Sequence, residues 1–331
     1  LPRIPDNIEL GIGLIGAGYI AEIGHIPAFV EAGYNITAAA DLSEERREYC
    51  RKMAGIDKVF SDYRSLLELP DIQIVDITVP QSSPNKIQII HDSIDAGKNI
   101  LVEKPLAMDY LEAKMVVQHA HRAGIKLAVC HQYRWMPVFR VIKNLIDQGY
   151  LGELFLLSMD ERRSYDYPEK YYNNQPRWLL FMDAIHFVDQ FRWWTCQEPN
   201  RVFASLSRRP GQYAKGEMLG TLVMEFEEEL HATYVACDAT HPQTQYHHIR
   251  IEGTEGVINA KFDDLFGSGE LEYSSTESKS FWYKPSLEGK AFTNGFIGLM
   301  GNLIEAITEG KEPEVSGTDN LKTLQIILAG Y

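Results

Sequence analysis

Residues 10–41, LGIGLIGAGYIAEIGHIPAFVEAGYNITAAAD, carry the strongest structural signal in the sequence. An apolar run over 10–15 leads into a glycine-rich turn, a helix is expected next, and a second apolar run from Ile36 ends at Asp41. Strand, helix, strand and terminal acid in this order form the βαβ unit that binds dinucleotides. The segment therefore predicts an N-terminal Rossmann domain.

The turn itself predicts how a diphosphate would be held. Gly16 permits the tight turn, and Gly18 has no side chain to keep a pyrophosphate away from the backbone. Tyr19 and Ile20 follow at the start of the helix, where free N–H groups bind anions. These four residues are the predicted pyrophosphate site.

Asp41 predicts the choice of cofactor. A carboxylate at the end of the second strand can accept hydrogen bonds from both hydroxyls of an adenosine ribose, whereas a 2′-phosphate there would meet like charge. NAD is therefore favoured over NADP. Arg46 and Arg47 lie close enough in the sequence to keep that preference moderate.

Composition narrows the function classes. A chain of 331 residues suggests two domains, and a net charge of −14 argues against nucleic acid or an anionic membrane as a partner. The four cysteines are far apart and no stretch approaches the apolar length of a membrane span, which favours a cytoplasmic protein with reduced thiols. His241, His247 and His248 complete no zinc ligand set, so no metal is expected.

Strand and helix patterns alternate up to about residue 130 and predict a doubly wound parallel sheet, with its ligand crevice at the carboxyl ends of the strands. The apolar strand 72–79 stops at Pro80, and the strand 99–102 ends in Glu103-Lys104-Pro105. Pro80 and Glu103 are therefore expected beside the nicotinamide. Lys104 can project its ammonium to the nicotinamide and to a substrate hydroxyl.

The pattern changes after Tyr133. Short runs of alternating polarity predict a C-terminal α+β domain with an open, largely antiparallel sheet, and helices over 176–194 and 295–309 are expected on one face of it. The predicted domain limits are 1–130 and 131–318. Arg163 and Tyr165 lie in a stretch of aromatic and charged residues that could line a sugar site, or could instead form a surface loop with oligomer contacts.

Several motifs together resemble one family. GLIGAGYIA at 13–21, ADLSEER at 40–46, DAGKNILVEKPLA at 95–107 and HQYRWMPVFR at 131–140 are similar to the Gfo/Idh/MocA oxidoreductases, the family of glucose-fructose oxidoreductase and inositol dehydrogenase. The resemblance continues through GYLGEL at 149–154, IHFVD at 185–189 and EGTEGVI at 252–258. It implies hydride transfer between a secondary hydroxyl of a sugar, inositol or related polyol and NAD(P). It also implies a C-terminal helix, here 319–331, that packs back on the first domain, and a homodimer or homotetramer built through the second sheet.

The resemblance also assigns roles to residues. The family's EKP lysine corresponds to Lys104, its tyrosine-arginine pair to Tyr133 and Arg134, which could contact substrate or nicotinamide, and its catalytic histidine to His186. Hydride leaves a carbinol carbon only as the O–H proton is removed, so His186 is expected to be the general base. Lys104 would hold the oxygen and stabilise its developing negative charge.

Two departures from the family pattern concern the substrate class. The aspartate usually found four residues before the histidine is Met182 here. Asp183 is expected either to take its catalytic and substrate-binding role from a different angle or to be only a structural neighbour of the histidine. The segment QSSPNK at 81–86 replaces the usual Asn-x-x-His and puts Lys86 in place of its histidine. Two other functions stay open: an enzyme that uses NAD transiently to cleave a glycosidic bond, and a non-catalytic NAD(P)-binding sensor.

Overall fold

The computed structural model describes residues 1–227, 229–262, 266–276 and 281–331. The chain divides into two compact units, the first formed by 1–135 and 292–321 and the second by 136–291 and 322–331. Residues 292–321, which the sequence placed mostly in the second domain, therefore group with the first unit. The limits 1–130 and 131–318 stay a prediction.

The first unit contains a six-stranded sheet in which every ladder is parallel, with the strand order β3-β2-β1-β4-β5-β6. This confirms the predicted Rossmann topology. Its central strands are almost entirely buried, as expected where helices cover both faces. The strands are β1 (Ile12–Ile15), β2 (Ile36–Ala40), β3 (Lys58–Phe60), β4 (Ile74–Ile77), β5 (Asn99–Val102) and β6 (Leu127–Val129).

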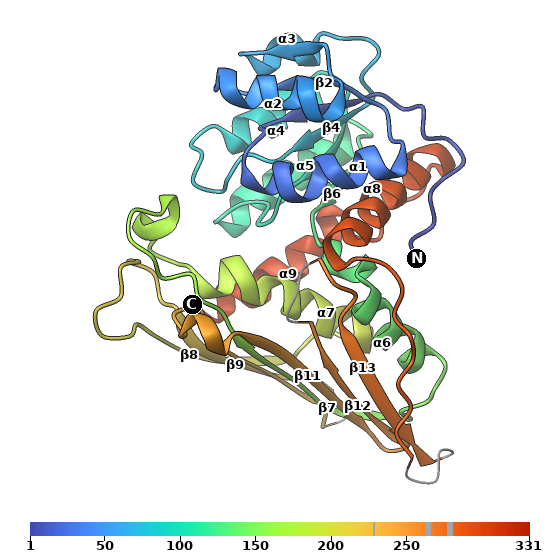
Figure 1. Cartoon of the computed structure of the whole chain (residues 1–331), viewed down its shortest axis with the longest axis vertical. Helices are drawn as coiled ribbons and strands as arrows, with labels where there is room; N and C mark the ends of the chain where they lie inside the picture. Colours follow the sequence, from blue (N-terminus) through green and yellow to red (C-terminus); the bar gives the residue numbers. More distant parts are fainter. Residues whose placement is uncertain (228, 263–265, 277–280) are drawn as a thin grey trace. The chain divides into compact units, whose positions relative to one another are not determined.

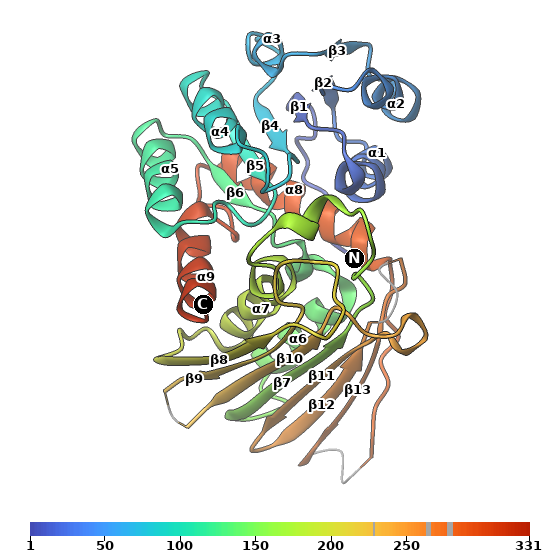
Figure 2. The same cartoon turned by 90° about the vertical axis from the view of Figure 1, so that its left-hand side faces the viewer.

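Helices cover both faces of this sheet (Figure 2). A π-helical turn, η1 (Ala21–His25), leads into α1 (Ile26–Ala32), which lies with α2 (Glu44–Ala54) on one face, while α4 and α5 lie on the other. Side chains cap three of these helices: Ser43 accepts a hydrogen bond at the start of α2, Asp62 accepts one at the start of α3, and Asp109 accepts two at the start of α5. The remaining elements of 1–135 are α3 (Tyr63–Leu67), α4 (Lys86–Asp95), α5 (Tyr110–Arg122) and η2 (Gln132–Trp135).

Helix α8 (Ala291–Glu309) completes the core of the first unit from a distant part of the sequence. The ring of Phe296 lies 4.2 Å from that of His25, centroid to centroid, and the Tyr34 hydroxyl donates a hydrogen bond of 2.8 Å to the Ile297 carbonyl. A Cβ at Gly298 would lie 2.3 Å from the Trp135 ring. The close packing explains why glycine stands there.

The second unit contains a seven-stranded sheet with the order β13-β12-β11-β7-β10-β9-β8. Only the β7–β10 ladder is parallel among the described strands, so the predicted open, largely antiparallel sheet is confirmed. The strands are β7 (Leu154–Arg162), β8 (Arg201–Ser207), β9 (Leu219–Glu225), β10 (His231–Cys237), β11 (Tyr246–Gly253), β12 (Gly256–Lys261) and β13 (Glu270–Ser275).

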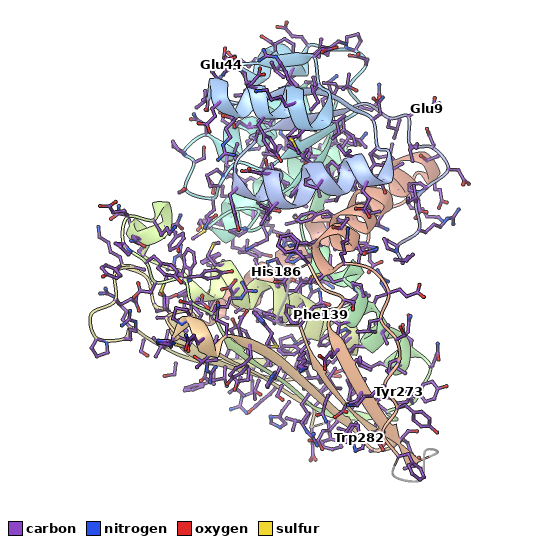
Figure 3. All side chains as sticks on the ribbon, viewed as in Figure 1. Glu9, Glu44, Phe139, His186, Tyr273 and Trp282 are labelled. Atoms are coloured by element: carbon purple, nitrogen blue, oxygen red, sulfur yellow. The ribbon has the colours of Figure 1, made fainter. Side chains whose placement is uncertain are left out.

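One face of this sheet is covered by α6 (Pro137–Asp147) and by η4 (Leu180–Ala184) with α7 (Ile185–Thr195) (Figure 1). Phe139 of α6, labelled in Figure 3, stacks on Trp194 with 5.7 Å between ring centroids and meets Phe262 edge-on at 5.0 Å. Residues alternate between buried and half-exposed along β7, β9 and β10, as a sheet covered on one face requires. Short helices η3 (Tyr171–Asn174) and η5 (Pro242–Thr244) lie in loops, and α9 (Gly317–Ala329) passes from the first unit to the second at Leu321.

None of the helices within the described ranges combines the length and apolarity needed to cross a bilayer.

Candidate active site

The glycine turn after β1 leaves room for a ligand. Gly16 has a φ of 92°, which disfavours any residue with a side chain. A Cβ built on Gly18 would meet no atom of the described residues within 4 Å, so the space over this residue is open. Tyr19 is exposed and Ile20 half-buried at the start of η1. These residues fit the pyrophosphate of a dinucleotide, which needs such a close approach to the backbone.

Asp41 lies beside this turn and holds it. Its Oδ2 accepts a hydrogen bond of 2.7 Å from the Ala17 N–H, and its Oδ1 accepts one of 2.8 Å from the Ser43 N–H. A carboxylate has about four lone-pair positions, so both oxygens can still accept from ribose hydroxyls. Asp41 therefore combines a structural role with the predicted ribose contact.

The two arginines near Asp41 are paired with other carboxylates. Arg46 donates a hydrogen bond of 2.6 Å to Glu22, and Arg47 forms an ion pair with Glu44. Arg47 also donates to the Asp41 carbonyl at 2.6 Å. Since both guanidinium groups have acidic partners, they compensate little for the like charge that a 2′-phosphate would meet at Asp41.

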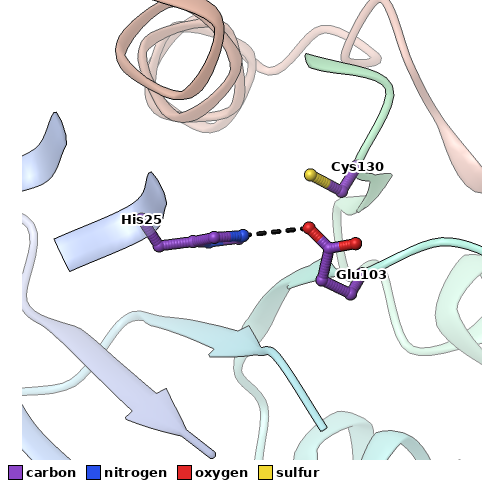
Figure 4. Close-up of side chains that lie close together, drawn as sticks. All are labelled: His25, Glu103 and Cys130. Carbon is purple, nitrogen blue, oxygen red and sulfur yellow. Dashed lines mark hydrogen bonds and ion pairs between the residues drawn. The ribbon is translucent and has the colours of Figure 1, made fainter. Parts of the chain in front are cut away.

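Glu103, the first residue after β5, belongs to a buried charge cluster (Figure 4). Its Oε1 lies 3.0 Å from His25 Nε2, and His25 Nδ1 lies 2.8 Å from Asp76 Oδ2. Burial lowers the pKa of His25, but the two carboxylates outweigh it and raise this pKa to about 9. Burial likewise raises the pKa of Glu103, and the hydrogen bond from His25 brings it below its usual value. At neutral pH an imidazolium therefore bridges the two acids.

The backbone around Lys104 is held by Lys86. The Lys86 ammonium donates hydrogen bonds of 2.6 Å to the Glu103 carbonyl and 2.6 Å to the Pro105 carbonyl, which flank Lys104 on either side. Lys86 is buried, and burial lowers its pKa to about 8 although Glu103 opposes the shift. Lys104 itself is half-buried, and Pro80, past the end of β4, is exposed.

Tyr133 and Arg134 lie in η2 and are both buried. Arg134 donates hydrogen bonds of 3.0 Å to the Glu314 carbonyl and 2.7 Å to Asp319 Oδ2. Both acceptors belong to the first unit. Arg134 thus ties η2 to the segment that leads into α9.

In the second unit, three of the predicted substrate residues lie together. Arg163 Nη1 donates hydrogen bonds of 2.8 Å to Asp183 Oδ1 and 3.0 Å to the Tyr165 hydroxyl. His186, labelled in Figure 3, is buried in the first turn of α7, three residues after Asp183. Met182, at the position of the family's aspartate, is half-buried.

Arg163 also has a second acidic partner that the sequence did not indicate. Its Nε lies 2.7 Å from Glu161 Oε1, and His247 Nε2 lies 3.1 Å from the same oxygen, while the Tyr234 hydroxyl donates to Oε2. Burial would raise the pKa of Glu161, but Arg163, His247 and Tyr234 lower it to about 2. Glu161 is therefore a permanent anion that fixes Arg163.

Asp238 is a further acid in this group, and its pKa is shifted in the opposite direction from that of Glu161. Its Oδ2 accepts a hydrogen bond of 2.7 Å from the Trp178 indole. Burial raises the pKa of Asp238 well above its usual value, and the nearby Asp183 and Glu161 carboxylates raise it further. The Asp238 carboxyl therefore keeps its proton to a higher pH than an exposed aspartate does.

A signal for these residues was present in the sequence. Asp76 interrupts an apolar strand, and Glu161 occupies the inward position of β7 that follows buried Leu157 and Met159. A charged residue at such a position needs a buried partner, because an unpaired charge in a protein core costs several kcal/mol. His25 and Arg163 are those partners.

Two sets of buried groups have the spacing of metal ligands, since one candidate atom from each residue lies within 4.8 Å of the others. They are His25 with Glu103 and Cys130, and Glu161 with Asp183 and Asp238. In the first set the His25 imidazolium already supplies the positive charge, and in the second the Arg163 guanidinium does so. Ion pairing within the protein accounts for both.

Comparison with known proteins agrees with this geometry. Residues 10–131 match an oxidoreductase family with an NAD-binding Rossmann fold, and residues 139–259 match the GFO/IDH/MocA C-terminal domain. A D-apiose dehydrogenase from Paraburkholderia graminis is 25% identical over 331 residues, which cover 96% of this chain and 86% of the relative. A levoglucosan dehydrogenase in complex with NADH has a TM-score of 0.84 at 22% identity and covers 97% of this chain and 95% of its own. An Agrobacterium radiobacter oxidoreductase in complex with NAD+, L-tartaric acid and magnesium has a TM-score of 0.86 at 21% identity, with coverage of 97% and 94%. The resemblance found in the sequence is thereby confirmed, and the chain belongs to the Gfo/Idh/MocA oxidoreductase family, whose first domain is an NAD-binding Rossmann fold.

Proposed function

We propose that this protein is an NAD-dependent dehydrogenase that transfers hydride between a secondary hydroxyl of a sugar, inositol or related polyol and the nicotinamide. The observation that carries the proposal is the open space over Gly18 next to Asp41, which suits a dinucleotide with an unphosphorylated ribose. The D-apiose and levoglucosan dehydrogenases among its relatives support the class of substrate.

His186 is proposed as the general base that removes the hydroxyl proton. Bound NAD would supply the hydride acceptor. Lys104 is proposed to donate a hydrogen bond to the same oxygen, because an ammonium stabilises the negative charge that develops as the proton leaves. The anchored main chain on both sides of Lys104 supports this role, since a fixed charge needs no reorganisation during the reaction.

Arg163, Tyr165 and Asp183 are proposed to bind the substrate. Planar guanidinium and carboxylate groups suit a polyol, because neighbouring hydroxyls both donate and accept hydrogen bonds. Arg163 is already oriented by Glu161 and Asp183, so its free energy cost of ordering is low.

A substrate screen tests the proposal. Purified protein is incubated with D-apiose, levoglucosan, inositols and sugar acids together with NAD or NADP, and NADH absorbance is recorded. We expect net NADH formation with at least one polyol. A preference for NADP of more than about tenfold would contradict the role of Asp41. Substrate cleavage without net NADH would favour the glycosidic-bond reaction, and cofactor binding without turnover would favour the sensor.

A substitution tests the base. His186→Ala should abolish turnover and leave NADH affinity nearly unchanged, measured by fluorescence titration. His231→Ala is the matched control, because His231 is an exposed histidine at the start of β10 in the same unit. Turnover that survives in His186→Ala would remove this residue from its proposed role.

We also propose that the protein forms a homodimer or homotetramer through the second sheet. Phe203 is 66% exposed on β8, and half-exposed Val223 and Val235 occupy outward positions on β9 and β10. Light scattering coupled to size exclusion should give a mass of two or four chains. A single chain mass at micromolar concentration would contradict this assembly.

A further inference from the structure

Lys86 is a buried lysine of the first unit whose ammonium donates to two main-chain carbonyls on either side of Lys104. It begins α4 and is 3% exposed, and its ammonium lies 2.6 Å from the carbonyl oxygens of Glu103 and Pro105. One cation therefore joins the peptide groups that flank Lys104. We propose that Lys86 is a positioning residue: its two hydrogen bonds, called the clamp below, fix the main chain on both sides of Lys104. Only the link from this clamp to catalysis rests on the proposed function.

The place of these carbonyls explains why a clamp is needed. The β5 ladder ends at Val102, and the following Glu103 N–H still donates a hydrogen bond of 2.9 Å to the Ile77 carbonyl. Past this point the chain leaves the sheet while still buried. Buried carbonyls need donors, and the Lys86 ammonium supplies two.

A second anchor acts on the same segment. The Glu103 carboxylate is held by His25 Nε2 at 3.0 Å, and Asp76 holds the other nitrogen of that ring at 2.8 Å. Glu103 is thus fixed through its side chain by η1 and through its carbonyl by α4. With the backbone anchored on both sides, any rearrangement of Lys104 is confined to its side-chain torsions.

A buried charge at position 86 indicates that Lys86 does more than fill space in the core. Burial disfavours the charged form of Lys86, as its lowered pKa shows, and Lys104 opposes that charge as well, while Glu103 and Cys130 favour it. An apolar side chain would fill the same volume without this desolvation cost. What it could not do is donate to two carbonyls.

Lys98 offers a matched control. It is also a buried lysine of the first unit, at 8% exposure, and its ammonium donates hydrogen bonds of 2.9 Å to the carbonyls of Leu69 and Ile72. Lys98 precedes β5, whereas Lys104 follows it. Lys98→Met therefore removes the same chemistry from the opposite end of the strand.

Hydrogen-deuterium exchange read by mass spectrometry tests the clamp without cofactor or substrate. In Lys86→Met, the amides of residues 103–108 should exchange about tenfold faster than in the wild type. In Lys98→Met, these amides should stay within about twofold, and exchange should rise at 69–73. Unchanged exchange at 103–108 in a folded Lys86→Met, or equal acceleration there in both variants, would overturn the proposal. If circular dichroism shows that Lys86→Met does not fold, Lys86→Gln takes its place, because its side chain is one atom shorter and uncharged and cannot keep both contacts of 2.6 Å. Exchange at 103–108 should then still exceed that in Lys98→Met, and equal exchange in the two variants would overturn the proposal.

Steady-state kinetics test whether the contacts of Lys86 affect catalysis. With a substrate found in the screen, Lys86→Met should lower kcat about 10- to 100-fold while the Kd for NADH stays within about threefold, because a misplaced group affects the transition state more than cofactor binding. Lys98→Met should keep the wild-type kcat. An unchanged kcat in Lys86→Met would remove the catalytic link. If the wild type turns over no compound, the proposed function fails, and the exchange result still decides whether Lys86 holds the Lys104 segment.

Discussion

The His25 cluster predicts a stability that depends on pH in a defined direction. The folded protein raises the pKa of His25 from 6.5 to about 9, so it binds this proton more tightly than the unfolded chain does. At about 1.4 kcal/mol for each factor of ten, the difference of 2.5 corresponds to about 3 kcal/mol of unfolding free energy. This contribution is fully present below pH 6.5 and is lost as the pH rises through about 9.

The variant His25→Asn tests this value. Asparagine can still donate toward Asp76 but carries no charge, so it lacks the pH-dependent contribution. Urea titrations followed by circular dichroism at pH 6 and pH 9.5 would give the free energy of unfolding of each protein. The wild-type advantage over His25→Asn should shrink by about 3 kcal/mol between these pH values.

Lys86 also titrates in this range, and the comparison of the two proteins cancels its contribution. Burial lowers the pKa of Lys86 to about 8, which makes stability rise with pH from about 8 upward. This contribution is present in both proteins and cancels in the difference. His91→Asn is the control, because burial lowers the pKa of His91 and its contribution therefore changes below pH 6.5. A wild-type advantage that stays constant between pH 6 and 9.5 would refute the bridging imidazolium.

Three further predictions concern single positions. Asp238→Asn should cost about 1 kcal/mol or less of unfolding free energy, because its amide oxygen can still accept from Trp178, whereas Asp238→Ala should cost about 1–3 kcal/mol. Equal thermal unfolding of both variants would contradict the importance of this hydrogen bond. Gly24→Ala should destabilise the protein by about 1–3 kcal/mol in urea titrations, because its Cβ would lie 2.4 Å from the Phe296 ring. An unfolding free energy of this variant equal to that of the wild type would mean that the Phe296 ring moves aside without cost. Gly18→Ala should change the free energy of unfolding by less than about 0.5 kcal/mol, since its Cβ meets no described atom. The same variant should raise the Kd for NADH about tenfold or more, and an unchanged affinity for NADH would place the diphosphate elsewhere.

The sequence predicted the two sheets because strand formation depends on local patterns. The apolar run 72–79 and the alternating run 153–159 became a doubly covered strand and a half-covered one, as their periodicity indicated. The helix 295–309 was also recognised, but its unit was not. An apolar helix can pack on either core, and only the complementary Gly24 and Trp135 surfaces place it in the first unit.

The candidate site was predictable where function depends on side-chain identity. The glycine turn, Asp41, Arg163 and Asp183 could each be named because the proposed role requires a particular residue type, whereas the contact between Arg163 and Asp183 was not foreseen. The contacts of Lys86 could not be foreseen, because its partners are backbone carbonyls, which every residue has. The contacts of Arg134 were not foreseen either: one of its acceptors is the Glu314 carbonyl, and the other, Asp319, lies far along the sequence.

The discontinuity of the first unit has a consequence for synthesis. When the first 135 residues have left the ribosome, the nascent domain still lacks the ring that packs against His25, the carbonyl that accepts from the Tyr34 hydroxyl and the helix surface that meets Trp135. All of these come from α8, which is translated after the entire second sheet. The nucleotide-binding half is therefore expected to reach its final stability only near the end of translation, although its strands are made first.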